Sequence, residues 1–118
     1  MIKERLIKEG KWVESEYSLT KTDIYEYQFI DNEGELKKGY KVSEKHYDPD
    51  TEKLEETFDY YVIFNDEDEV VEFSLDATGY NYYWSGTSSF RKKDEKITLY
   101  DIVRISNMIC EYVEEKMK

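Results

Sequence analysis

The chain has 118 residues, of which 39% are hydrophobic, 38% charged and 16% aromatic, and its formal net charge is −11. Disordered chains contain fewer apolar residues than this, so we expect a folded protein. A chain of this length can bury a core of its own. No apolar run approaches the roughly 20 residues that cross a bilayer, so we expect no membrane partner. The composition predicts a single acidic α+β domain over residues 1–118.

Two features of the sequence indicate the cellular compartment. Residues 1–5 carry three charged side chains and lack the apolar core of a signal peptide. The single cysteine, Cys110, cannot form an internal disulfide, which agrees with a reducing compartment. We therefore expect a cytoplasmic protein.

A short helix is predicted at the N-terminus. Ile2, Leu6 and Ile7 have helical spacing, and Gly10 suits the left-handed residue that follows a helix, which favours a helix over residues 2–9. The apolar residues between 12 and 19 indicate a strand or an extended lead-in.

Residues 24–75 alternate aromatic or β-branched side chains with charged ones, as half-buried antiparallel strands do. The pattern predicts a meander of strands 24–31, 36–47, 53–64 and 69–75, with turns at 32–35, 48–51 and 65–68. Periodicity leaves open whether residues 79–86 form a fifth strand or a loop. The polar residues 87–96 are expected to form a loop.

The strand register should bring apolar side chains together, since a slip of one residue turns a strand inside out. One set of pairs satisfies this condition along the whole meander. It places Tyr27 opposite Tyr40, Tyr25 opposite Val42, Val42 opposite Phe58, Tyr40 opposite Tyr60, Tyr60 opposite Phe73, and Val62 opposite Val71. The predicted core layer is therefore made of Tyr, Phe and Val. Asp59, Tyr61 and Glu72 would share the other face, and Glu44 would lie against Glu56, a repulsive pair.

The C-terminal helix is predicted over residues 97–118 and should pack on one face of the sheet. Thr98 and Asp101 have capping-box spacing. Apolar and small residues recur at helical spacing along one face, which we expect to be the packing face: Leu99, Ile102, Val103, Ser106, Ile109, Cys110, Val113 and Met117.

Catalytic and metal-binding patterns are weak in this sequence. His46 is the only histidine, and Cys110 is expected on the apolar helix face, so neither nucleophilic catalysis nor a structural zinc site is supported. The acids at 48–52 and 66–69 lack the spacing of a calcium loop, and no phosphate-binding glycine motif occurs. We expect no enzyme, no cofactor and no metal.

An aromatic segment precedes a basic one near residue 85. Tyr80, Tyr82, Tyr83 and Trp84, followed by Arg91–Lys93, could in principle stack and neutralise a single nucleic-acid strand. However, a net charge of −11 would repel the phosphates. We expect these aromatics to serve the core or a protein contact, with no direct nucleic-acid binding.

The excess of negative charge lies in residues 44–76, which hold thirteen acidic residues and only Lys45 and Lys53 as bases. The leading hypothesis is a non-enzymatic inhibitor, a nucleic-acid mimic that binds a basic surface of a nuclease or another nucleic-acid-binding protein. Phage anti-defence proteins, such as anti-CRISPR or anti-restriction proteins, and immunity proteins for nuclease toxins are such classes. The predicted contact residues are Asp48, Asp50, Glu52, Glu55, Glu56, Asp59, Tyr61, Asp66, Glu67, Asp68, Glu69 and Glu72.

Two alternatives remain open. The protein could be an interaction or assembly module that uses Tyr82, Tyr83 and Trp84 or an exposed sheet edge, with the acidity serving only solubility. It could also bind a small ligand in an aromatic pocket between helix and sheet.

Overall fold

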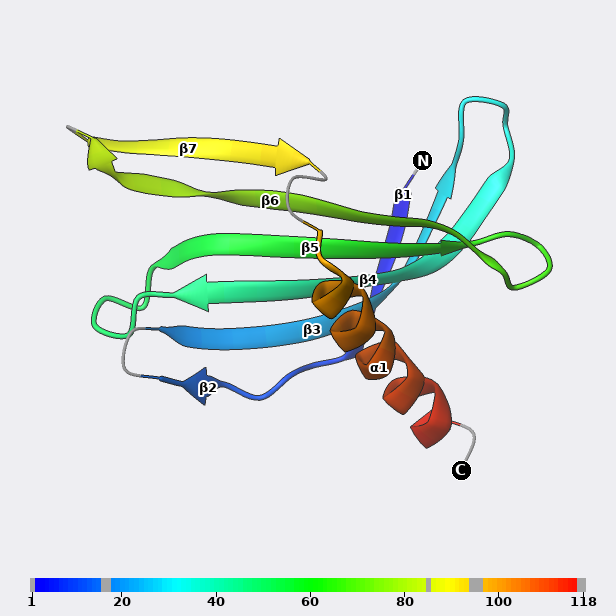
Figure 1. The fold of residues 1–118 in the computed structure, drawn as a ribbon, viewed down its shortest axis with the longest axis horizontal. Helices are drawn as coiled ribbons and strands as arrows, with labels where there is room; N and C mark the ends of the chain where they lie inside the picture. The colour runs from blue at the N-terminus through cyan, green and yellow to red at the C-terminus, as the bar shows by residue number, and fades with distance from the viewer. Residues whose placement is uncertain (1, 16–17, 85, 94–96, 117–118) are drawn as a thin grey trace.

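Seven strands and one helix make up the computed structural model, which describes residues 2–15, 18–84, 86–93 and 97–116 and, over 80–84 and 86–93, the backbone path (Figure 1). The elements are β1 (Ile2–Lys8), β2 (Val13–Glu14), β3 (Leu19–Ile30), β4 (Leu36–Tyr47), β5 (Leu54–Phe64), β6 (Val70–Trp84), β7 (Gly86–Lys93) and α1 (Leu99–Lys116). The strands form one antiparallel sheet in the order β1-β3-β4-β5-β6-β7, and β2 also pairs with β3. The predicted meander is confirmed, and α1 crosses one face of the sheet.

The predicted N-terminal helix is wrong, because residues 2–8 form the edge strand β1. Six residues of β1 pair with β3, from Ile2 opposite Phe29 to Lys8 opposite Ile24. Gly10 does not cap a helix either. A Cβ added there would lie 1.9 Å from the carbonyl oxygen of Thr22, so this position admits only glycine because the two backbones approach closely.

The register between β3 and β4 differs by one residue from the predicted one. Tyr27 lies opposite Gly39 and Tyr25 opposite Lys41, while Ile24 pairs with Val42. The loop between these strands therefore spans five residues, 31–35, where four were predicted. As a result, Tyr25, Tyr27 and Phe29 lie on the face away from α1.

The other two hairpins differ by two residues from the predicted register, which leaves each side chain on its expected face. Val42 pairs with Tyr60, and Val62 pairs with Phe73. In both hairpins the connection between the strands is one residue longer than predicted, 48–53 rather than 48–52 and 65–69 rather than 65–68, and a β-bulge next to it adds one more. The prediction that Asp59, Tyr61 and Glu72 share a face is confirmed.

The core lies between α1 and the middle of the sheet. Its most buried side chains are Ile105 of α1 and Val42 of β4, both with no exposed surface. Around them pack further buried residues of the sheet and the helix: Ile24, Tyr60, Val62, Leu75 and Ile109. The Tyr/Phe/Val layer is thus confirmed for β4–β6, whereas β3 contributes Ile24 in place of its tyrosines.

The packing face of α1 is only partly the predicted one. Ile109 and Val113 contact the core, but Leu99 and Val103 are 76% and 51% exposed, and Cys110 is exposed as well. The helix is rotated so that Ile105, which was not predicted, becomes its most buried residue. Met117 lies outside the described residues.

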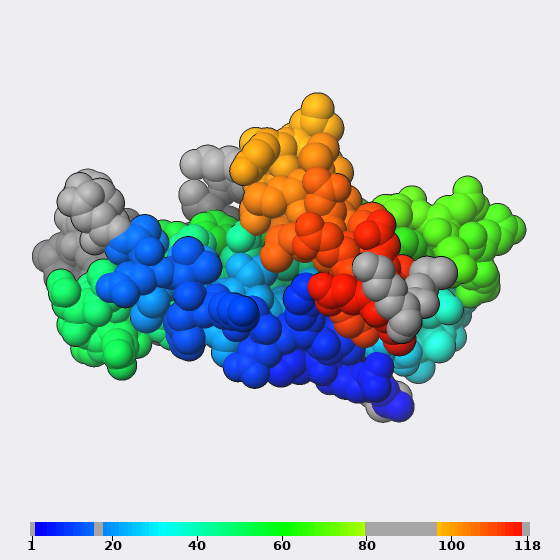
Figure 2. Space-filling model, turned by 90° about the horizontal axis from the view of Figure 1, so that it is seen from below, coloured from blue at the N-terminus to red at the C-terminus, as the bar shows by residue number. Residues whose placement is uncertain are grey.

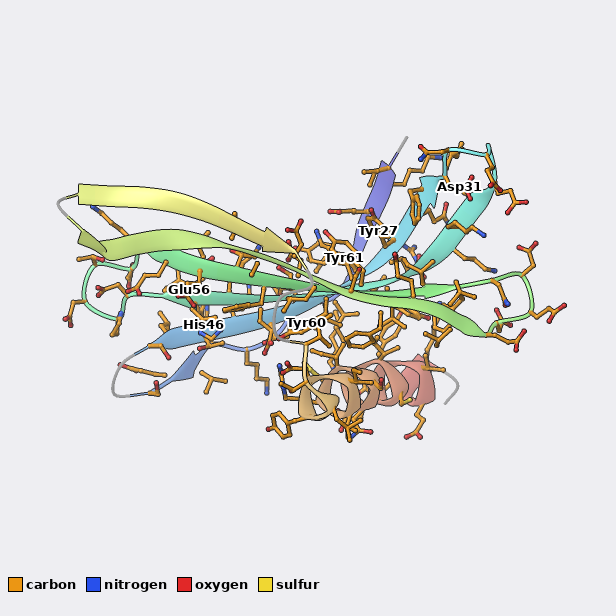
Figure 3. All side chains as sticks on the ribbon, turned by 45° about the horizontal axis from the view of Figure 1, so that its top comes forward. Tyr27, Asp31, His46, Glu56, Tyr60 and Tyr61 are labelled. Carbon is orange, nitrogen blue, oxygen red and sulfur yellow. The ribbon has the colours of Figure 1, made fainter. Side chains whose placement is uncertain are left out.

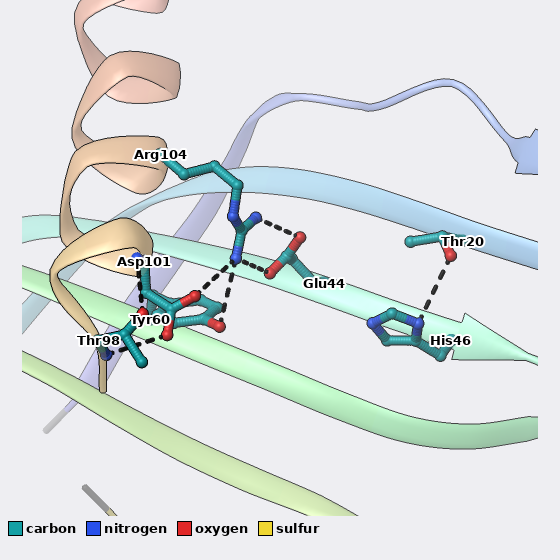
Figure 4. Close-up of polar contacts among 7 residues, drawn as sticks. All are labelled: Thr20, Glu44, His46, Tyr60, Thr98, Asp101 and Arg104. Atoms are coloured by element: carbon teal, nitrogen blue, oxygen red, sulfur yellow. Dashed lines mark hydrogen bonds and ion pairs between the residues drawn. The ribbon is translucent and has the colours of Figure 1, made fainter. Parts of the chain in front are cut away.

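Polar contacts fix the N-terminal half of α1 on the sheet (Figure 4). The predicted capping box is confirmed: the N–H of Asp101 donates to Thr98 Oγ1 (3.1 Å), and the N–H of Thr98 donates to Asp101 Oδ2 (3.2 Å). Arg104 donates two bonds to the carboxylate of Glu44, at 2.7 and 2.9 Å. Glu44 lies opposite Phe58 in the sheet, so the predicted repulsion with Glu56 does not arise.

This cap makes stability depend on pH. Partial burial raises the pKa of Asp101, but bonds from Thr98 and the charge of Arg104 outweigh it and hold the pKa below its ordinary 3.8. Because the folded pKa is the lower one, the stabilisation by Asp101 is present above about pH 4 and is lost as the pH falls through the folded pKa. Asp101→Asn should cost about 1 kcal/mol of unfolding free energy at pH 7.

Urea unfolding of the wild type and of Asp101→Asn, measured across this pH range, checks the prediction. The difference between the two proteins should shrink below about pH 4. Glu111→Gln, on the exposed side of the same helix, is the control and should show no such convergence. A difference that stays constant with pH would contradict the role given to Asp101.

Candidate functional site

The acidic stretch does not form one continuous surface, because its two turns lie at opposite ends of β5. The 11 residues of that strand separate the turn at 48–53 from the turn at 65–69 by roughly 35 Å. In Figure 3, His46 and Glu56 lie near one end of the sheet, and Asp31, in the turn between β3 and β4, lies at the other end. The predicted contact residues must therefore be considered in separate groups.

The first group lies around the β4–β5 turn and serves the turn itself. Asp48 Oδ1 accepts bonds from the N–H groups of Asp50 and Thr51, which lower the pKa of Asp48. Glu52 has a left-handed backbone with φ of 60°. The pKa of Glu55 is raised by partial burial and by the charges of Asp48 and Glu56. Asp48 and Glu52 thus serve the local turn geometry, and only Asp50 and Glu52 in this group are exposed.

A second group lies on the face of the sheet away from α1. Tyr61 is half-buried against Tyr27, with ring centroids 5.0 Å apart, and burial followed by the charge of Asp59 raises the pKa of Tyr61 (Figure 3). Asp59 is also half-buried, and its Oδ1 has no hydrogen-bond partner among the described residues. Of the three predicted residues on this face, only Glu72 is exposed to a partner.

The third group, Asp66–Glu69, is exposed and has acidic neighbours that sequence reasoning missed. The β3–β4 turn lies at the same end of the sheet as the β5–β6 turn, and both turns line a cleft of about 510 Å³. We call the combined carboxylates the acidic tip: Asp31, Glu33, Glu35, Asp66, Glu67, Asp68 and Glu69. Alternate turns of an antiparallel meander share an end, and this signal could have predicted the grouping.

The two turns of the acidic tip have the same hydrogen bonds. Asp31 Oδ1 accepts from the N–H groups of Glu33 and Glu35, just as Asn65 Oδ1 accepts from Glu67 and Glu69, all at 2.9 Å. In each turn the fourth residue has a left-handed backbone. This residue is Gly34 in the first turn, with φ of 82°, and Asp68 in the second, with φ of 61°.

The comparison of the two turns predicts that Asp68→Gly stabilises the protein. Glycine accepts the left-handed conformation without the steric cost of a side chain, so the unfolding free energy should rise by about 0.5–1 kcal/mol. Asp68→Asn removes the same charge and keeps the side chain, so it separates the backbone effect from charge relief. Thermal unfolding of the three proteins checks this, and a destabilised Asp68→Gly would contradict the assignment.

Few bases offset the charge of the acidic tip. Lys37 donates to Glu35 at 3.3 Å, and no other ion pair involves the seven carboxylates in the described part of the chain. One carboxylate oxygen from each of Asp31, Glu33 and Glu35 lies within 4.8 Å of the other two. Exposed apolar side chains, Leu36 and Val70, follow the two turns. The tip thus offers dense negative charge with apolar surface beside it, which suits a basic partner.

The aromatic segment lies in a hairpin of β6 and β7. Residues 79–84 extend β6, and Tyr80 pairs with Ser89 in β7, so the predicted loop over 87–96 is wrong for residues 87–93. The side chains of Tyr82, Tyr83 and Trp84 lie outside the described residues. Their predicted role as a second contact surface stays a prediction.

Two residues considered for catalysis have structural surroundings. The ring of His46 packs edge-on against Phe58, and its Nδ1 lies 3.5 Å from Thr20 Oγ1. Cys110 lies on α1, whereas His46 lies on β4, so the two side chains come from different elements.

In the described ranges of the chain, α1 is too polar to cross a membrane.

The fold and the tip define an acidic antiparallel sheet with one covering helix and a carboxylate cluster at one end. Comparisons of the chain with protein-family models, curated proteins and solved structures found no significant match.

Proposed function

We propose that the protein is a non-enzymatic inhibitor whose acidic tip binds a basic surface of a nucleic-acid-handling protein. The observation that carries this proposal is the convergence of two acidic turns, distant in sequence, at one end of the sheet. Seven carboxylates with a single ion-paired lysine in the described part of the chain make a local field that neither turn would give alone. Such a surface attracts proteins that hold phosphate backbones.

The turns present their charges in a fixed arrangement. Each carries three or more carboxylates on a loop closed by side-chain and backbone hydrogen bonds. A preorganised charge cluster loses little conformational entropy on binding, which favours affinity. The exposed apolar residues Leu36 and Val70 would supply the contact area that charge alone does not provide.

This proposal suits a phage or mobile-element anti-defence protein, of the anti-CRISPR or anti-restriction kind, and equally an immunity protein for a nuclease toxin. An acidic surface of this kind can occupy the groove in which a target protein holds nucleic acid. The cytoplasmic location expected from the sequence agrees with both classes.

Capture from host lysate tests the proposal. The immobilised protein should retain a nuclease or another nucleic-acid-binding protein at low salt and release it at high salt, because exposed charges are screened by salt. The retained protein should also lose its nuclease or binding activity when the acidic protein is added. A retained partner that has no basic surface and resists high salt would contradict the proposal.

The second candidate, an interaction module, is favoured by a separate observation. Leu99, Tyr100 and Val103 form an exposed apolar stripe on α1 that no described part of the chain covers. If this module is the function, Leu99→Gln with Val103→Gln should abolish partner capture. Under the leading proposal, that double variant should capture the same partner as the wild type.

A further inference from the structure

A groove runs between the C-terminal half of α1 and the sheet, next to the acidic tip. Its volume is about 680 Å³, within the range of protein binding sites. In Figure 2, α1 stands above the sheet, and the turn between β5 and β6 (yellow-green) rises beside it. The groove therefore opens on the side of the molecule where the tip carboxylates are concentrated.

The floor and one wall of the groove are apolar. Tyr40 and Phe64 stack edge to face with ring centroids 5.9 Å apart, and Ile109 and Val113 of α1 complete the apolar surface. Cys110 lines the same wall and is exposed. Such a surface binds aliphatic and aromatic groups by removing them from water.

The carboxylates that line the groove differ in whether a basic side chain neutralises them. Glu26 is neutralised by Arg5, at 2.6 Å, and by Lys116. Asp68 and Glu114 have no ion-pair partner among the residues that the structure describes. Burial raises the pKa of the Tyr40 hydroxyl, and the charges of Tyr112, Glu26 and Asp68 raise it further. Asp68 lines the groove together with Tyr40. Lys38 is the one base among the described residues of the lining.

We infer that this groove binds a segment of the partner protein that carries an arginine next to an apolar side chain. The aliphatic stem of arginine can lie on Tyr40 and Phe64 while its guanidinium bonds to Asp68 and Glu114. The carboxylates of the groove select the arginine by its charge, and the apolar floor selects the apolar side chain beside it. The inference rests on the proposed function, because it names the contact that anchors the same basic partner beside the acidic tip.

Cys110 provides a direct measure of groove occupancy because it is the only cysteine in the chain and is exposed. The probe is a short capped peptide of leucine and arginine, and its control is the leucine–glutamate peptide of the same length. A saturating arginine peptide should slow the reaction of Cys110 with an aromatic disulfide by at least about fivefold, since thiol reactivity follows exposure. The glutamate peptide should leave the rate unchanged.

Two matched double variants locate the binding. Asp68→Asn with Glu114→Gln should weaken peptide binding about tenfold, through loss of two charge-assisted hydrogen bonds. Glu14→Gln with Glu111→Gln removes the same net charge at exposed positions outside both the groove lining and the acidic tip, and it should change peptide binding less than about twofold.

Equal weakening in both variants, or no protection of Cys110 by the arginine peptide, would overturn the inference. The acidic tip is tested separately by Glu33→Lys with Asp66→Lys and Glu67→Lys. If these reversals abolish capture of the partner while the peptide fails to protect Cys110, the groove inference fails and the proposed function stands. If the peptide protects Cys110 but the tip reversals leave capture intact, the proposed function fails instead.

Discussion

Reversing three acids of the tip, by Glu33→Lys, Asp66→Lys and Glu67→Lys, is expected to weaken partner binding about a hundredfold or more at low salt. The three side chains are exposed. Their substitution leaves intact the hydrogen bonds that the Asp31 and Asn65 side chains accept and that close the two turns. Attraction between the tip and a basic surface becomes repulsion, which lowers the association rate as well as the affinity. Titration calorimetry with the captured partner measures the effect.

The control reverses three acids at the opposite end of the sheet, by Glu14→Lys, Asp50→Lys and Glu52→Lys. These residues are also exposed, and the change in net charge is the same. Binding should weaken only a few-fold, because charges more than a Debye length from the interface are screened. Equal effects of the two triple variants would show that net charge, rather than the acidic tip, governs binding. Circular dichroism should show that both variants keep the fold.

Ile105→Ala is expected to lower the unfolding free energy by about 3 kcal/mol, since it empties a fully buried position. Ile105 packs at the centre of the contact between α1 and the sheet. Leu99→Ala removes a comparable side chain from the same helix but should cost less than about 0.5 kcal/mol, because Leu99 is 76% exposed.

Urea unfolding of the two variants distinguishes the observed orientation of α1 from the one predicted by its apolar spacing. A large loss in Leu99→Ala with a small loss in Ile105→Ala would support the predicted packing face and contradict the structure. The hydrophobic pattern of α1 does not decide between them, because two apolar stripes run along this helix. Only contact with the sheet determines which stripe is buried.

The strands of the meander could be predicted from the alternation of apolar and charged residues. Which face of the sheet each side chain occupies depended on the length of the turns. Each connection between strands is one residue longer than predicted, and in each of these loops Asp31, Asp48 or Asn65 accepts backbone N–H bonds. β-bulges beside Tyr47 and Phe64 added a second residue and restored the predicted faces of β5 and β6. The first hairpin has no bulge, so β3 is inverted relative to the prediction.

The N-terminal strand could not be predicted, because its apolar residues fit a helix equally well. Ile2, Leu6 and Ile7 are spaced as on one helix face, yet Leu6 pairs with Tyr25, and Ile7 packs against the core cluster. The pairing with β3 is a long-range contact, which local spacing does not report. The edge strand therefore follows from tertiary context.

The candidate site was predicted in part. Counting charge along the chain found Asp66–Glu69 but joined them to Asp48–Glu52, which lies at the other end of β5. The same count left out Asp31, Glu33 and Glu35, because their neighbours in sequence are basic. Charge density in space depends on which turns share an end of the sheet, and this follows from topology rather than from sequence windows.

The central claim is that the acidic tip occupies the surface on which the partner holds nucleic acid. The most direct measurement is a competition in which labelled duplex DNA bound to the captured partner is titrated with the acidic protein. The account predicts complete displacement of the DNA by the wild type and by the far-end variant, and none by the tip variant. A stable ternary complex of partner, DNA and acidic protein would contradict it.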